Sequence, residues 1–297
     1  EVTGTALPET EDPDAVSATV KAFMAADLPH QLINLLEKLV LQRSDFSDNR
    51  NLQNLLILTA IRCSADEGAP PGQGRAMEYI TRLDNFDGAE IAEIALRDDY
   101  ALYEEAFTIY KKFNDNVAAV DVLLNNIMDL TRAYEYAERV GESEVWSHLA
   151  AAQLSSGQVK EAIDSYIRAD DPSEYRAVAG AAREAGKFAE LVRYLTMCRT
   201  KLKERFIDTE LVYAMAQTKA LSDLEIFITS PNLADIQSIG DRCYDEQAYD
   251  AAKLLFNSIS NHPRLASCLV HLGSYREAVE AARKANSIRT WKEVNAA

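Results

Sequence analysis

Residues that interrupt regular structure are scarce in this chain, which has only 11 glycines and 8 prolines among 297 residues. Ala, Leu and Glu dominate instead, and these residues favour helices. Apolar residues make up 47% of the chain, which excludes a disordered protein and is enough for a large buried core. The composition therefore predicts an all-α protein.

Positive charge and long apolar runs are also lacking. The formal net charge is −16, which argues against nucleic acid and against an anionic membrane surface, because both need clustered Lys and Arg. No apolar run approaches the roughly 20 residues that a membrane span requires. The opening "EVTGTALPETEDPD" has no signal-peptide pattern. It looks like a cut through a longer chain, so part of the function is expected outside this sequence.

Metal ligands and redox motifs are few. The cysteines form no CxxC motif and lie in apolar helical runs, so we expect reduced core residues in a cytosolic protein. His271 follows Cys268 by three residues, but two ligands do not close a zinc site, and we predict that it packs in the core. Neither a metal nor a cofactor is expected. The residues concerned are Cys63, Cys198, Cys243, Cys268, His30, His148, His262 and His271.

Catalytic signatures are missing as well. The sequence contains no GxGxxG, GxxxxGK[ST] or GxSxG motif. General acid–base chemistry could use the acid pairs Asp98-Asp99, Glu104-Glu105 and Asp170-Asp171, but no candidate base has an identifiable partner. We expect these acids at hairpin ends or on outer helix faces, as solvated charges. The sequence predicts that the protein is not an enzyme.

A weak unit recurs along most of the chain. It is clearest in "GQVKEA", "GKFAEL" and "GSYREA", aligned on the residue two after the glycine. Successive anchor residues are separated by 27, 29, 29, 33, 28 and 26 residues, which is typical of a helical solenoid. The anchors are Tyr103, Leu130, Val159, Phe188, Leu221, Tyr249 and Tyr275.

Each unit is predicted to hold two antiparallel helices, as the repeat at residues 143–171 illustrates. Ser143 can cap the first helix, and Gly157 can end it in the left-handed conformation that glycine tolerates. A second helix then runs from Val159 until Asp170-Asp171-Pro172, because the residue before proline is disfavoured in α conformation. The predicted architecture is a superhelix of stacked helical hairpins.

The N-terminal third is less regular. Two helices are expected on either side of Leu28-Pro29, and a third over residues 51–63. The stretch "SADEGAPPGQG", residues 64–74, is rich in glycine and proline, and we predict a flexible surface loop there.

Two features are candidate partner contacts. Arg199, Lys201, Lys203 and Arg205 form the main basic cluster of an acidic chain. They are interpreted either as a solvated helix end favoured by the helix dipole or as a contact for an acidic segment of a partner. Tryptophans at 146 and 291 usually fill the core of a solenoid, although exposed ones anchor interfaces; the sequence does not decide for Trp291.

Several long blocks resemble the clathrin heavy chains: "RNLQNLLILTAI", "VKEAIDSYI", "IGDRCYDEQAYDAAKLL", "LVHLG" and "RTWKEV". The resemblance covers nearly the whole chain. It implies the end of the distal leg, the knee and the start of the proximal leg, built from clathrin heavy-chain repeats. The implied divisions are 1–127 with a surface insertion at 64–74, 128–270, and a truncated repeat at 271–297.

The resemblance also implies function. Clathrin heavy chains are coat scaffolds without enzymatic activity; three form a triskelion whose legs pack into cages around vesicles. Implied partners are other heavy chains and a clathrin light chain, whose binding region would begin near residue 210. A tethering or sorting solenoid of the vacuolar protein sorting type shares the repeat and is the alternative. A helical-toroid enzyme would need convergent polar groups that the sequence does not show.

Overall fold

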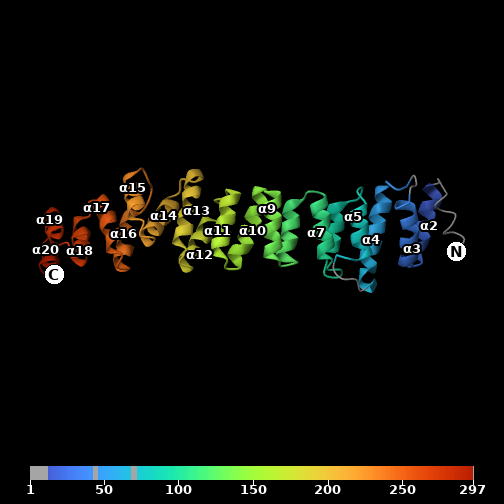
Figure 1. Cartoon of the computed structure of the whole chain (residues 1–297), viewed down its shortest axis with the longest axis horizontal. Coiled ribbons are helices and arrows are strands. Elements are labelled where there is room, and N and C mark those ends of the chain that lie inside the picture. Colours follow the sequence, from blue (N-terminus) through green and yellow to red (C-terminus); the bar gives the residue numbers. More distant parts are fainter. Residues whose placement is uncertain (1–12, 43–45, 68–71, 297) are drawn as a thin grey trace. The chain divides into compact units, whose positions relative to one another are not determined.

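The computed structural model describes residues 13–42, 46–67 and 72–296 (Figure 1). All regular structure in these ranges is helical, in helices α2 to α20. This confirms the predicted all-α class. The chain divides into two compact units, residues 1–140 and 141–297. The divisions expected after residues 127 and 270 stay a prediction.

The first unit packs consecutive helices against one another, as α3 on α4, α6 on α7 and α8 on α9. The helix break expected near Leu28-Pro29 is confirmed, because α3 begins at Pro29. The helices are α2 (Pro13–Ala25), α3 (Pro29–Val40), α4 (Arg50–Glu67), α5 (Arg75–Arg82), α6 (Gly88–Ala95), α7 (Tyr103–Lys112), α8 (Asn116–Asn125) and α9 (Leu130–Val140).

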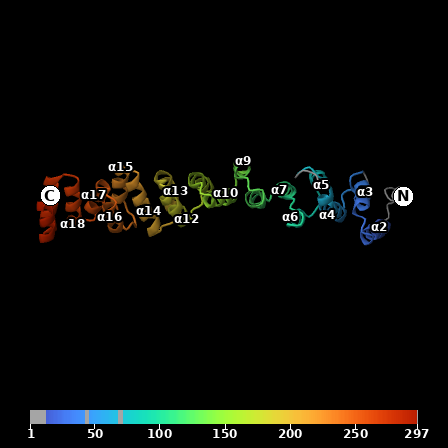
Figure 2. The same ribbon diagram turned by 90° about the horizontal axis from the view of Figure 1, so that it is seen from below.

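The second unit stacks helical hairpins in chain order (Figures 1 and 2). Each hairpin also packs on the next, through α11 with α13, α14 with α16, and α18 with α20. The helices are α10 (Ser143–Ser155), α11 (Val159–Ala169), α12 (Tyr175–Glu184), α13 (Phe188–Lys201), α14 (Arg205–Gln217), α15 (Leu221–Thr229), α16 (Ile236–Asp245), α17 (Tyr249–Ser258), α18 (His262–His271), α19 (Tyr275–Ala285) and α20 (Ile288–Ala296).

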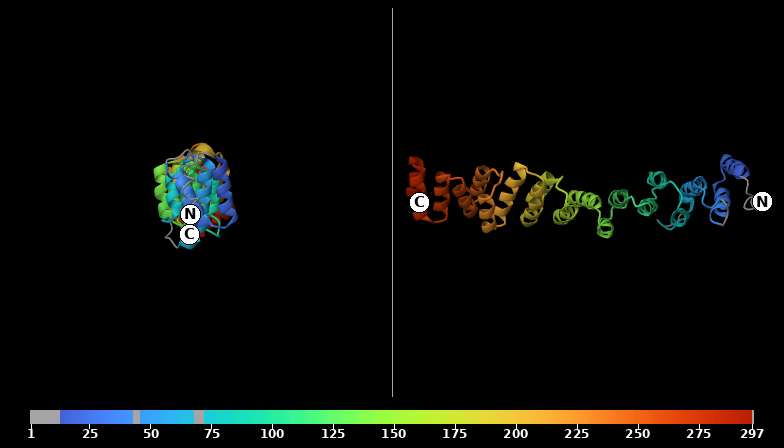
Figure 3. Two further views of the ribbon diagram at one scale, coloured as in Figure 1. Left: turned by 90° about the vertical axis from the view of Figure 1, so that its right-hand side faces the viewer. Right: turned by 90° about the horizontal axis from the view of Figure 1, so that it is seen from above.

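The repeat register predicted from the sequence is confirmed. Each of the seven anchor residues is the first residue of a helix, from Tyr103 in α7 to Tyr275 in α19. The right-hand view of Figure 3 shows the same succession of helices within each unit from another side. Anchors thus mark the start of the second helix of each hairpin.

The turns within the hairpins share one backbone conformation. The residue two before every anchor has a positive φ, for example 76° at Gly157 and 56° at Lys219. After Ala101 and Met128 the next backbone N–H reaches back seven and six residues. In the other five turns it reaches back five, as Gln158 does to the Gln153 carbonyl at 2.9 Å. This is the Schellman pattern, which satisfies carbonyls that the helix end leaves free. Glycine is only one of the residues that occupy this position.

A prediction follows for the turn positions. Lys219→Gly is expected to stabilise the chain and Gly157→Ala to destabilise it, each by about 1 kcal/mol, because a side chain disfavours the left-handed region. A Cβ at Gly157 would meet no atom within 4 Å, so the cost there comes from the backbone alone. Urea denaturation followed by circular dichroism measures both changes; equal midpoints for the two variants would contradict this account.

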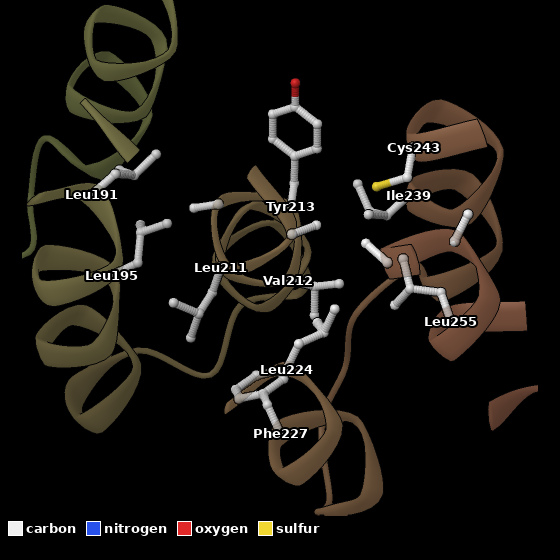
Figure 4. Close-up of a cluster of buried hydrophobic side chains, with 14 of the residues drawn as sticks. Leu191, Leu195, Leu211, Val212, Tyr213, Leu224, Phe227, Ile239, Cys243 and Leu255 are labelled. Atoms are coloured by element: carbon white, nitrogen blue, oxygen red, sulfur yellow. The ribbon is translucent and has the colours of Figure 1, made fainter. Parts of the chain in front are cut away.

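The core of the second unit runs continuously from hairpin to hairpin. Helix α14 lies between α13 on one side and α16 with α17 on the other, with α15 below it in Figure 4. Leu211, Val212 and Leu224 of this cluster are at most 1% exposed. Burial of both sides of α14 explains why this helix is apolar around most of its circumference.

Two local features differ from what the sequence predicts. Ser143 does not cap α10; its hydroxyl donates to the carbonyl of Ala169 at the end of α11. Within the predicted loop 64–74, residues 64–67 are the last turn of α4, and 68–71 lie outside the described residues. Gly72 lies against α7, where Glu105 accepts a hydrogen bond from its backbone.

Candidate partner-binding surface

The basic cluster spans the end of α13 and the start of α14. Arg199 and Lys201 lie in the last turn of α13, where the helix dipole favours positive charge. The chain becomes extended at Leu202, and α14 begins at Arg205. All four basic residues therefore lie on, or within one turn of, the short connection between α13 and α14.

Arg199 is held by contacts within the chain. Its Nε donates to Oδ1 of Asp208 at 2.8 Å, and its Nη2 donates to the carbonyl of Pro231 at 2.8 Å. The guanidinium carbon is 4.7 Å from the ring centroid of Phe227. The other oxygen of the buried Asp208 accepts from the backbone N–H of Leu233 at 2.7 Å. Arg199 and Asp208 together fix the loop between α15 and α16.

Lys201 and Arg205 also form ion pairs with neighbouring repeats. Lys201 pairs with the carboxylate of Asp170 and donates to the Asp170 carbonyl at 2.7 Å. Nη2 of Arg205 lies 2.7 Å from Oδ2 of Asp235, which precedes α16. Sequence reasoning missed these pairs, although the acids lie about one repeat away in the chain.

Lys203 differs from its three neighbours. It is exposed, and within the described ranges the structure gives it no ion pair. Among the four basic side chains, it is the one whose ammonium group can meet a partner without first leaving an acid of this chain.

The tryptophans lie in different surroundings. Trp146 is buried, with the guanidinium of Arg168 at 4.7 Å from its ring, and it fills the core as expected. Trp291, in α20, is half-buried and packs against the core of the second unit. Packing therefore covers part of the Trp291 side chain, and the rest is accessible.

The cysteines lie in the core as the sequence predicts, but His271 does not. All four cysteines are buried thiols that form no disulfide with one another, which confirms their placement in the core. Burial raises the pKa of the Cys198 thiol to about 11, so the unreactive thiol persists at neutral pH. His271 is not a core residue: it is exposed, stacks on Tyr249 with ring centroids 4.4 Å apart, and lies 3.1 Å from the Tyr244 hydroxyl.

One acid pair contradicts the expectation of solvated charges. Glu104 is paired with Arg132, but Glu105 is buried and 2% exposed. Among the residues that the structure describes, its Oε2 finds no hydrogen-bond partner. Burial raises the pKa of Glu105 above its ordinary value, whereas the hydrogen bond from Arg132 lowers the pKa of Glu104. The helical spacing of the residues did not reveal that Glu105 is buried, because its side chain faces a neighbouring element.

These two glutamates should respond to pH with opposite signs. Ionised Glu105 costs stability above its raised folded-state pKa, and the cost disappears as the pH falls through that value. Glu105→Gln is therefore expected to raise the free energy of unfolding near pH 8 by on the order of 1 kcal/mol, with a smaller gain near pH 4.

Glu104→Gln is the matched control. It should lower stability near pH 8, because the ionised carboxylate pairs with Arg132, and the loss should fade as the pH falls through the lowered folded-state pKa. Thermal unfolding at several pH values measures both effects, and a loss of stability in Glu105→Gln near pH 8 would contradict the prediction.

The described part of the chain shows neither a metal-binding group nor a helix that could span a membrane. Residues 13–42, 46–67 and 72–296 contain no group of three or more His, Cys, Asp or Glu placed to hold a metal ion. Over the same residues, every helix is too short or too polar to cross a membrane.

Known proteins similar to this chain are clathrin heavy chains. Human clathrin heavy chain 2 and the Drosophila melanogaster clathrin heavy chain are each 56% identical over 294 residues, 99% of this chain. The probable clathrin heavy chain of Schizosaccharomyces pombe is 51% identical over 297 residues. The chain spans 17% of the length of each of these relatives.

The family comparison agrees with these relatives. Residues 7–161 and 166–297 match the family described as "Clathrin: Region in Clathrin and VPS". The match includes all seven repeat anchors and nearly all of both compact units. The chain therefore belongs to the clathrin family defined by this region.

Proposed function

We propose that this chain is a leg segment of a clathrin coat scaffold. The observation that carries the proposal is the sequence identity between this chain and clathrin heavy chains, which is 51% to 56% over 294 residues or more. Identity at this level includes surface positions as well as the buried faces that any helical repeat needs. Stacked hairpins suit such a role, since each repeat supports its neighbours and leaves long faces free for other chains.

The proposed partners follow from this role. Other clathrin heavy chains would pack against the segment in the polyhedral lattice, where many individually weak contacts act together. Trimers would form through another part of the heavy chain, and the membrane would be reached only through adaptors. The proposed location is the cytoplasmic face of coated pits and coated vesicles, in endocytosis and intracellular transport. The role is structural and requires no catalytic residue.

A clathrin light chain is the proposed second partner, with a binding region that begins near residue 210. The basic connection between α13 and α14 supports contact with an acidic partner segment. Lys203 is the group best suited to it, because Arg199, Lys201 and Arg205 are engaged with acids of this chain. Trp291 is proposed as an apolar contact farther along the same unit.

Calorimetric titration with a clathrin light chain tests this assignment. Lys203→Glu is expected to weaken binding about tenfold, because it reverses an unpaired charge at the contact. Lys160→Glu is the matched control, since Lys160 is an exposed lysine of α11 away from the connection. Binding that both variants weaken equally would remove Lys203 from the contact, and a wild-type chain that fails to bind would remove the light chain as a partner of this segment.

A tethering or sorting solenoid of the vacuolar protein sorting type is the alternative, because the family description includes VPS proteins. The heavy-chain relatives at 51% to 56% identity favour the coat scaffold over it. The alternative predicts no affinity for a clathrin light chain, so the same titration separates the two functions.

A further inference from the structure

One cation contacts both a carboxylate and an aromatic ring of the preceding repeat in the first unit. Arg132 of α9 donates from Nη1 and Nη2 to the two oxygens of Glu104 in α7, at 2.6 and 2.9 Å. Its guanidinium carbon also lies 5.6 Å from the ring centroid of Phe107, one turn farther along α7. The two contacts fix the guanidinium group from two directions.

A related arrangement, with one cation–carboxylate contact in place of the double hydrogen bond, recurs in both units. Nε of Arg264 in α18 lies 3.0 Å from Oδ1 of Asp241 in α16, and the Arg264 guanidinium is 5.3 Å from the Tyr244 ring centroid. In the first unit, Nζ of Lys112 lies 2.7 Å from Oδ1 of Asp84 and 5.7 Å from the Phe86 centroid.

These three clusters share one spacing along the sequence. The ring follows the acid by two or three residues, and the cation follows the acid by 23 to 28 residues, which is about one repeat. Each cluster therefore joins equivalent parts of successive repeats rather than the two helices of one hairpin. Such recurrence separates them from the chance ion pairs of a charged surface.

The chemistry of the clusters favours close packing at the surface where two successive repeats meet, which we call the repeat boundary. A guanidinium group binds a carboxylate through two parallel hydrogen bonds and stacks on aromatic rings, which a lysine ammonium does less well. The side chains of Arg132 and Glu104 are 39% and 28% exposed, so water and salt screen this pair less than a fully exposed one. Opening the boundary would break both contacts at once.

We propose that these acid–aromatic–cation clamps keep individual repeat boundaries closed, so that the chain opens locally, one boundary at a time. Each clamp controls the boundary that it spans: Arg132 the one between α7 and α9, and Arg264 the one between α16 and α18. The proposal concerns local opening within a unit and does not depend on the coat function.

Hydrogen exchange on the full chain, read by mass spectrometry, tests the proposal. Arg132→Ala is expected to speed exchange in α7 and α9 about tenfold and to leave α16 and α18 unchanged, because exchange reports the local opening equilibrium. Arg264→Ala should show the reverse pattern. Arg132→Lys, which keeps the charge but loses the double hydrogen bond, should speed exchange in α7 and α9 to an intermediate extent.

Arg82→Ala is the matched control, because Arg82 pairs with Glu78 at 2.8 Å within the single helix α5. Exchange in α7 and α9 that rises no more in Arg132→Ala than in Arg82→Ala would overturn the proposal. A uniform rise through all helices would also overturn it, since it would mean a global loss of stability. Glu104→Gln removes the acid with little change of shape and should reproduce the local pattern if Arg132→Ala folds poorly.

Discussion

Replacing Gly240 with alanine is expected to lower the free energy of unfolding by about 2 kcal/mol, since it forces extra volume into a packed core. Gly240 lies in the middle of α16, and an added Cβ would be 2.8 Å from a ring carbon of Phe256 in α17. The Phe256 side chain is fully buried and cannot rotate into solvent. Close approach of α16 and α17 therefore depends on this glycine.

The chain offers two controls for this substitution. Gly180 occupies the middle of α12, and an added Cβ would meet no atom within 4 Å. Gly180→Ala should stabilise the chain by up to about 1 kcal/mol, because alanine is the better helix former. Gly88→Ala would approach Phe113, but that side chain is 42% exposed and can move aside. Urea denaturation that gives Gly240→Ala and Gly180→Ala the same sign would contradict the packing argument.

Replacing Asp208 with alanine is expected to cost about 3 kcal/mol, because it leaves a charged partner and a backbone donor without their acceptor. The Asp208 side chain is 6% exposed and binds both Arg199 and the N–H of Leu233. The same substitution should make the loop between α15 and α16 more mobile, since Arg199 also donates a hydrogen bond to the Pro231 carbonyl.

The control for Asp208 is an exposed pair that also joins successive repeats. Asp164 lies 3.0 Å from Arg193, with side chains 40% and 59% exposed. Asp164→Ala should cost no more than about 0.5 kcal/mol, because water solvates both ions once the pair is broken. Thermal and urea unfolding of the two variants measures the difference; equal losses would show that burial is not what makes Asp208 important.

The repeat register could be predicted because it depends on local chemistry. An apolar anchor and a small residue on the inner face recur at nearly even spacing, three of the turns also carry a glycine, and each feature acts through its own helix or turn. The turn at Lys219 shows the limit of that reasoning. Its backbone is left-handed at 56° without a glycine, because the Schellman hydrogen bonds and the packed hairpin outweigh the strain.

Contacts between repeats could not be predicted in the same way. Glu105 is placed as an outer-face charge by the helical period, yet it is buried by chain that lies outside that helix. Ser143 has the chemistry of a helix cap, but its hydroxyl finds a carbonyl of α11 instead. The basic cluster has its acids 9 to 31 residues away. Each case depends on which surfaces meet after the hairpins have formed.

The family assignment rests on sequence, and the structure explains how such a sequence serves a scaffold. Buried positions recur with the repeat, and several ion pairs within the chain join successive repeats. Lys203 is an exception to that pairing in the described part of the chain, which is why the proposed partner contact is centred on it.

Coat assembly by a chimeric heavy chain tests the proposed function most directly. The matching segment of the Drosophila melanogaster clathrin heavy chain would be replaced by this chain, and coats would be measured by sedimentation and electron microscopy. The scaffold function predicts that the chimera assembles coats in the same amount as the parent. A chimera that is folded by circular dichroism but stays unassembled in the supernatant would contradict it.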